Sequence, residues 1–339
     1  MSGEVIGLIM AGLLLAGLFM GHPLAMVLGG TAVLGAIIAG TPMVLGIVIN
    51  RIYGEVLDNY ILIAIPLFVL MGEFMSKSGM ATDLYKIANY FLRKLPGRLA
   101  VATVFGNAVF AAVTGVSIAS AMTFSRIAYP EMRRYGYNRS YSLGAIAGSA
   151  SLGMLIPPSV LMIVWGILTE QSIGQIFAAG ILPGLLLASL FIIYIFIFAL
   201  IKPEVVGGGT RAAVAVENGA AEEDEVSTAQ FLISLAGIII VIVAVLGGIW
   251  FGVFTPTEGA GAGALIGLAL GIIKGMRFRD IIDSILSVGR TSAPILLLLV
   301  TASLYSRTLA MTGLANAIEG VFLESGMAPW MIISVMVLI

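Results

Sequence analysis

Long apolar runs separated by short polar segments make up most of this chain. We expect membrane-spanning helices over residues 5–20, 24–49, 60–76, 141–165, 176–201, 231–253, 256–273 and 292–311. A helix needs roughly 20 apolar residues to cross a bilayer, and backbone polar groups in lipid must pair within the chain, so these runs form helices. The pattern predicts an all-α polytopic membrane protein. Short amphipathic helices are expected at the membrane surface over residues 77–94 and 280–290.

The composition agrees with this class and excludes several others. Hydrophobic residues make up 60% of the chain, charged residues 10%, and the mean hydropathy is +1.10, whereas about a quarter of a soluble domain is charged. A net charge of −1 argues against a nucleic-acid partner. The chain has no cysteine and one histidine, His22. It therefore lacks the residues of most catalytic triads and metal sites, and we predict a protein that is not an enzyme.

The basic residues predict how the chain is threaded through the membrane. If residues 97–135 form a re-entrant hairpin that enters and leaves on one face, every Lys and Arg except Arg51 and Arg307 lies on one side. If 97–135 instead crosses once, the basic residues between positions 274 and 290 move to the other side. The positive-inside rule therefore favours a hairpin whose base is cytoplasmic.

A weak internal repeat agrees with this threading. Pro23 and Pro256 are separated by 233 positions, and so are Pro96 and Pro329. Because an odd number of crossings separates the halves, the second half would be inverted, as in the repeats of secondary transporters. We therefore predict a first repeat at 1–201, an acidic cytoplasmic linker at 202–229 and an incomplete second repeat at 230–339. The chain stops inside an apolar run, and we expect it to be truncated within a second hairpin.

Two apolar segments contain residues that interrupt a helix. The hairpin breaks at Thr114-Gly115-Val116-Ser117, and the span at 141–165 contains Pro157-Pro158. Backbone carbonyls and hydroxyls freed at such breaks suit a dehydrated Na⁺ or a substrate carboxylate. Close helix packing through small residues and a simple kink are the alternatives. The broken stretches themselves, residues 111–121 and 148–159, contain no Asp, Glu or His, which favours Na⁺ over H⁺ as the coupling ion.

A third segment, residues 254–258 (FTPTE), is predicted to be a capped turn and not a site, with Thr255 at the helix N-cap and Glu258 in the first turn. The glycines that follow it at four-residue spacing predict a close-packing stripe. They are Gly259, Gly263, Gly267 and Gly271.

These motifs together resemble the large (M) subunit of tripartite ATP-independent periplasmic (TRAP) transporters. The resemblance rests on residues 65–72 (IPLFVLMG), 78–79 (SG), 114–117 (TGVS), 153–159 (GMLIPPS) and 254–258 (FTPTE). Their order and spacing agree with the family over essentially the whole chain. The chain departs from the family at Val116, because hairpin tips in the family often carry two adjacent serines and this one has Val116 before Ser117. The family's second hairpin and second proline-containing break are also absent from this sequence.

The resemblance implies an elevator-type, usually Na⁺-coupled importer of organic acids such as C4-dicarboxylates or sialic acid. Such a subunit lies in the bacterial inner membrane as a multi-pass protein. It works with a small four-helix membrane subunit and a soluble periplasmic substrate-binding protein. The alternative is an elevator-type anion or ion transporter that needs no binding protein.

The hairpin tip and the broken span are the predicted site. The residues expected at the Na⁺ site are Gly115, Val116, Ser117, Gly153, Pro157 and Pro158. The residues expected to bind the substrate are Thr114, Ser117, Ser120 and Ser159.

Overall fold

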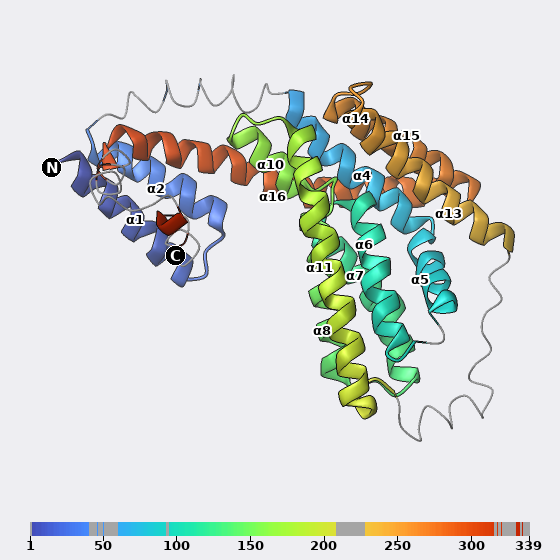
Figure 1. The fold of residues 1–339 in the computed structure, drawn as a ribbon. Coiled ribbons are helices and arrows are strands. Elements are labelled where there is room, and N and C mark those ends of the chain that lie inside the picture. Colours follow the sequence, from blue (N-terminus) through green and yellow to red (C-terminus); the bar gives the residue numbers. More distant parts are fainter. Residues whose placement is uncertain are drawn as a thin grey trace. The chain divides into compact units, whose positions relative to one another are not determined.

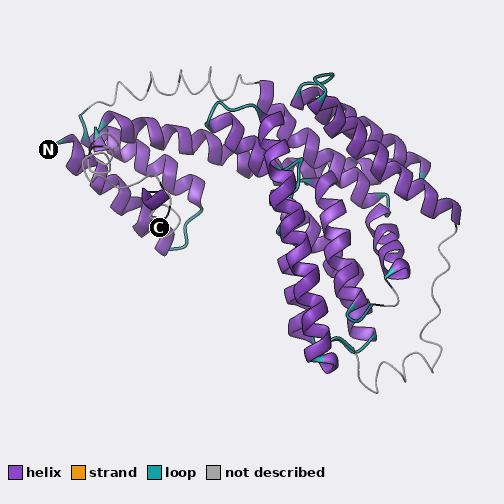
Figure 2. Cartoon of the chain, in the orientation of Figure 1, coloured by secondary structure: helices purple, strands orange, loops and turns teal. Residues whose placement is uncertain are grey.

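The computed structural model describes residues 2–40, 60–92, 95–207 and 228–314, and the isolated positions 46, 50, 317, 320, 330–332 and 334. Within these residues the secondary structure is helical, apart from one isolated bridge between Tyr137 and Val206 (Figure 2). The chain divides into two compact units, Met1–Asn59 with Ala293–Ile339, and Tyr60–Ser292. The prediction of an all-α protein is confirmed.

The first unit contains a pair of packed helices, α1 (Gly3–Phe19) and α2 (Leu24–Ile38). Gly21 has φ +79° in the turn between them, and Pro23 precedes the first residue of α2. The two helices approach closely at small residues, because a Cβ on Gly17 would lie 2.7 Å from the Val27 side chain. The part of α16 (Phe278–Met311) from Ala293 onward also belongs to this unit.

The second unit contains the remaining described elements, which Figure 1 labels where there is room. In chain order they are η2 (Tyr60–Ile63), α4 (Ala64–Lys77), α5 (Met80–Phe91), α6 (Arg98–Thr114), α7 (Ser117–Arg134), α8 (Arg139–Ala150), α9 (Leu152–Leu155), α10 (Val160–Leu168), α11 (Ile173–Ile201), η3 (Pro203–Val205), α13 (Thr228–Ile242), the π-helical turn η4 (Val243–Gly247), α14 (Gly248–Trp250), α15 (Pro256–Ile273) and the first part of α16.

Six helical segments among the described residues are long and apolar enough to cross a membrane. They are Tyr60–Lys77, Arg139–Leu168, Ile173–Ile201, Ile233–Trp250, Pro256–Ile273 and Phe278–Met311. α1, α2 and α6 are apolar but shorter. The chain is therefore a multi-pass membrane protein.

The helix predicted at 280–290 and the linker predicted at 202–229 differ from, or extend beyond, what the structure describes. The prediction of a separate short helix at 280–290 is wrong, because α16 runs without interruption from Phe278 to Met311. No turn follows residue 290, and Pro294 is accommodated inside the helix. The predicted linker at 202–229 is described only as far as Gly207, and its acidic run lies outside the described residues, as do Arg51 and Pro329. The inverted repeat and the second hairpin stay predictions.

The glycine stripe of α15 lets α4 and α14 pack closely against α15. All four of its glycines are buried. A Cβ on Gly263 would run into the Met71 sulfur of α4, and a Cβ on Gly259 would lie 3.0 Å from the Ile249 side chain. The close-packing prediction is confirmed. The capped turn is confirmed too, because Thr255 Oγ1 accepts a hydrogen bond from Glu258 N (3.3 Å) and Glu258 Oε2 accepts one from Thr255 N (2.8 Å).

A polar cluster ties three helices of this unit together. Lys274, the C-cap of α15, forms an ion pair with Asp83 of α5, and Ser234 of α13 donates to Asp83 Oδ2 at 2.5 Å. The Lys274 and Asp83 side chains are only 11% and 18% exposed. Removing one partner of a charge pair this buried leaves an uncompensated charge in a poorly solvated environment, which destabilises the fold.

We expect Lys274→Met to lower the thermal midpoint of the purified protein by roughly 5 °C or more, because breaking a buried pair costs about 3 kcal/mol. Lys77→Met is the matched control, since its partner Asp283 lies 4.0 Å away and is half exposed, and such pairs contribute at most about 1 kcal/mol. The double variant Asp83→Asn/Lys274→Met should recover part of the loss. Equal, small shifts for Lys274→Met and Lys77→Met would contradict this assignment.

Candidate functional site

The first break separates α6 from α7 by two residues. Gly115 has φ +62°, a left-handed conformation that costs a residue with a side chain about 1–2 kcal/mol. Its N–H closes α6 by donating to Ala111 O at 3.0 Å. Val116 is extended, and α7 begins at Ser117. Glycine at this position therefore lets the chain reverse between α6 and α7 within two residues.

The second break lies between α9 and α10. Ile156 and Ser159 are extended, and Pro157 and Pro158 between them have no N–H to donate. Ser159 Oγ donates to Met154 O at 2.8 Å. That side chain satisfies a carbonyl that the interrupted helix cannot pair. The four-residue interruption therefore turns one long span into two part-helices.

The structure brings the two breaks into contact. Val160 N, at the start of α10, donates to Gly115 O at 3.1 Å. A Cβ on Gly115 would run into Pro158 O, and a Cβ on Gly153 would lie 3.1 Å from Ser117 N. Two predicted segments that are about forty residues apart in sequence therefore form one locus. α4 closes it from a third side, because a Cβ on Gly72 would lie 2.7 Å from Thr114 Cα.

The predicted residues differ in burial and in what their side chains contact. Gly115, Gly153, Pro157 and Pro158 are buried, whereas Val116 and Ser117 are half-buried. Thr114 is buried, and its Oγ1 donates to Phe110 O of its own helix at 3.1 Å. Ser159 is also buried. Each of these two hydroxyls donates its proton to a carbonyl and retains acceptor capacity, which a cation could use.

Ser120 lies one turn into α7 and is fully buried. Its Oγ has no hydrogen-bond partner among the described residues. A buried hydroxyl without a partner is costly. Of the four predicted substrate residues, Ser120 is therefore the one whose hydroxyl is fully buried and still lacks a hydrogen-bond partner within the described residues.

The locus offers donors and acceptors of opposite polarity. α7 and α10 both begin here without a side-chain cap, so their first N–H groups carry partial positive charge. α6 and α9 both end here, and their last carbonyls carry partial negative charge. No group of three or more His, Asp or Glu residues that could hold a metal occurs among the described residues. The groups that the locus offers are therefore mostly neutral backbone and hydroxyl groups.

Sequence reasoning missed a polar contact behind the locus. Asn107 of α6 donates from Nδ2 to Ser149 Oγ of α8 at 2.6 Å, and both residues are fully buried. Asn107 Oδ1 has no partner within the described part of the chain. The sequence signal for this contact was Asn107 itself, a lone amide in an apolar helix, because polar residues at membrane depth usually have a role.

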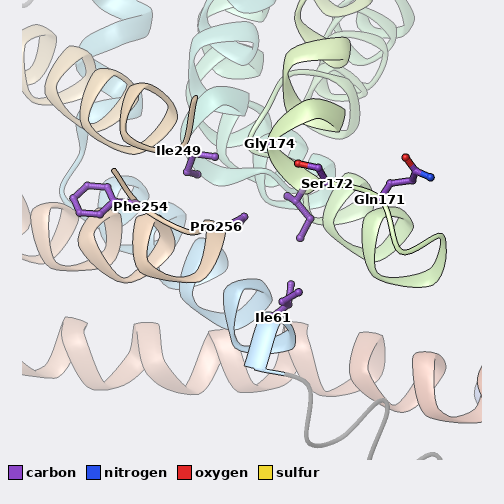
Figure 3. Close-up of a pocket in the computed structure, with 8 residues that line it drawn as sticks. Ile61, Gln171, Ser172, Gly174, Ile249, Phe254 and Pro256 are labelled. Carbon is purple, nitrogen blue, oxygen red and sulfur yellow. The ribbon is translucent and has the colours of Figure 1, made fainter. Parts of the chain in front are cut away.

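A separate pocket of about 270 Å³ lies at other loops of the same unit. Figure 3 shows Gln171 and Ser172, on the loop before α11, across from Ile249 and Pro256, with Ile61 nearby. None of the predicted site residues lines it. The predicted site residues therefore lie apart from this pocket, at the contact between the two breaks.

Comparison with known proteins places the chain in a family. The family model described as "Tripartite ATP-independent periplasmic transporter, DctM component" matches residues 11–339. The C4-dicarboxylate TRAP transporter large permease protein DctM of Pseudomonas aeruginosa is 33% identical over 83% of this chain and 63% of its own length. The protein of the same name from Rhodobacter capsulatus is 29% identical over 96% and 74%.

A third relative, the isethionate TRAP transporter permease protein DctMQ of Oleidesulfovibrio alaskensis, is 29% identical over 95% of this chain and 49% of its own length. The chain thus spans between about half and three quarters of the length of these three relatives. One family model matches nearly the whole chain. The chain belongs to the DctM-component family of tripartite ATP-independent periplasmic transporters.

Proposed function

We propose that this chain forms the ion- and substrate-binding part of the large permease of a Na⁺-coupled importer of organic acids in the bacterial inner membrane. The observation that carries the proposal is the contact between the hairpin tip at Gly115 and the broken span at Pro158. Two relatives are named C4-dicarboxylate permeases, which supports a carboxylate substrate.

The polarity of the locus suggests how it would treat its ligands. A substrate carboxylate would be stabilised by the uncapped N–H groups at the start of α7 or α10. A dehydrated Na⁺ would take carbonyl and hydroxyl oxygens from the residues around the breaks. Because these oxygen ligands are neutral, the charge of the bound Na⁺ would also offset the charge of the substrate carboxylate. This gives a physical reason for Na⁺ and the substrate to be transported together.

The proposed partners follow from the family. A tripartite system needs two components besides this permease, and we propose a small four-helix membrane subunit and a soluble periplasmic binding protein. One relative is itself named DctMQ, which supports a close association with a further membrane component. The alternative is an elevator-type anion or ion carrier that works without a binding protein.

Reconstitution separates these two proposals. The complete permease that contains this chain, in proteoliposomes with its small subunit, should take up radiolabelled C4-dicarboxylate only when both an inward Na⁺ gradient and the binding protein are supplied. A proton gradient of equal size without Na⁺ should not drive uptake. Uptake at the same rate without the binding protein would favour the alternative carrier, and uptake driven by protons alone would contradict Na⁺ coupling.

Ser117→Ala and Pro158→Ala test the residues of the ion site. Each should raise the Na⁺ concentration for half-maximal uptake by about five-fold, the equivalent of about 1 kcal/mol for one weakened ligand contact, while membrane insertion stays normal. Ser189→Ala is the control, because its hydroxyl donates to Leu185 O within α11, away from both breaks. Unchanged Na⁺ dependence in both site variants would contradict the assignment of Ser117 and Pro158 to the Na⁺ site.

Gly115→Ala tests the contact itself. The added Cβ meets both an unfavourable left-handed backbone and Pro158 O, so we expect uptake to be lost at normal membrane levels of the protein. Gly144→Ala in α8 is the matched control, since its Cβ would meet no atom within 4 Å. If Gly115→Ala transports as well as Gly144→Ala, the close contact of the two breaks is not needed for transport.

A further inference from the structure

A cluster of aromatic and basic side chains lies where α8 begins and α11 ends, away from the two breaks. The Tyr141 and Phe198 rings stack with centroids 5.2 Å apart and an interplanar angle of 11°. Tyr194 stacks on Phe198 at 5.7 Å, and Lys202 Nζ lies 6.0 Å from the Phe198 centroid. We call these four residues, together with Arg139, which begins α8 two residues before Tyr141, the interfacial patch.

Backbone contacts fix the two segments of the interfacial patch beside each other. Asn138 N, next to Arg139, donates to Val205 O at 2.9 Å, three residues beyond Lys202. Tyr137 and Val206 form the isolated antiparallel bridge. Tyr137 is buried, and this burial raises the pKa of its phenol to about 12, so it stays neutral at physiological pH. The two cations are therefore carried by anchored segments.

Within the described residues, no carboxylate pairs with the cations of the interfacial patch. Arg139 and Lys202 are both exposed, and neither has a carboxylate partner within the described residues. Arg139 lies in the first turn of α8, which contains no acidic residue, and a cation there is unfavourable against the helix dipole. Glu204, on η3, is the acidic residue nearest to Lys202 in sequence and is also exposed. A bound anion would relieve this repulsion.

The position of the interfacial patch identifies the kind of anion. α11 is 29 residues long, and only 22% of its most apolar window is buried within the protein. Apolar side chains on one of its faces are about half or more exposed and lead towards Tyr194 and Lys202. They are Leu186, Leu190, Ile193, Ile197 and Leu200. A Tyr and a Lys at the end of an apolar span are typical of the headgroup layer.

We propose that the interfacial patch binds the phosphate of an anionic phospholipid, with an acyl chain along the exposed face of α11. Arg139 and Lys202 contact the phosphate, and the Tyr194 and Phe198 rings lie beside the glycerol and upper acyl region. This assignment does not depend on the transported substrate or on the coupling ion.

Native mass spectrometry of the purified permease tests the proposal. Dioleoylphosphatidylglycerol and dioleoylphosphatidylcholine are titrated separately into wild type and Arg139→Gln/Lys202→Gln. Each basic residue near an anionic lipid contributes about a five-fold gain in affinity. The double variant should therefore bind phosphatidylglycerol about twenty-five-fold more weakly, with phosphatidylcholine binding and thermal midpoint unchanged.

The matched control is Arg279→Gln, an exposed arginine in the first turn of α16, where Asp280 follows it. It should leave phosphatidylglycerol binding within about two-fold of wild type. Retained phosphatidylglycerol binding in the double variant overturns the proposal, and so does an equal loss in Arg279→Gln. Full displacement of the lipid by millimolar inorganic phosphate would show a free-phosphate site and overturn it too.

Discussion

Every backbone N–H and C=O group within a bilayer must find a partner in the protein, and two interrupted helices make this demand acute here. The structure meets it by placing one break against the other. Gly115 O accepts from Val160 N, and Ser159 Oγ donates to Met154 O. Neither interruption would be tolerated facing lipid, so the close approach of Gly115, Gly153 and Gly72 to their neighbours is a condition for having breaks at all.

The same constraint explains why the locus is suited to ligands. A break that was fully satisfied by the protein would be inert, but the starts of α7 and α10 carry no side-chain caps, and Ser120 Oγ has no partner among the described residues. The remaining groups are neutral. Backbone N–H groups with partial positive charge and backbone carbonyls with partial negative charge meet in one region. A small cation and a carboxylate can share such a region, whereas a proton relay would need a titratable group that neither broken segment contains.

Local features were predictable from sequence, and contacts between distant side chains were not. Hydropathy located the six segments long enough to cross a membrane, whereas the predicted spans at 5–20 and 24–49 correspond to the shorter helices α1 and α2. The positions of both helix breaks, the Thr255–Glu258 capping box and the glycine stripe of α15 each depend on residues close together in the sequence. The Asp83–Lys274 pair, the Asn107–Ser149 bond and the Tyr141–Phe198 stack join residues between about forty and two hundred positions apart, and no period marks them. The amphipathic pattern at 280–290 predicts a helix, but nothing in it indicates that the helix continues to Met311.

Labelling at the hairpin tip tests the central claim most directly. The chain has no cysteine, so Ile118→Cys, an exposed position beside Ser117, gives this chain a single thiol, which lies next to the site. In membranes containing the permease, Na⁺ should slow maleimide labelling of this thiol several-fold relative to equal K⁺, and added substrate should slow it further, while a thiol at Arg279→Cys reacts at the same rate throughout. Labelling of Ile118→Cys that is indifferent to Na⁺ and substrate would contradict the view that the contact of the two helix breaks is the binding site.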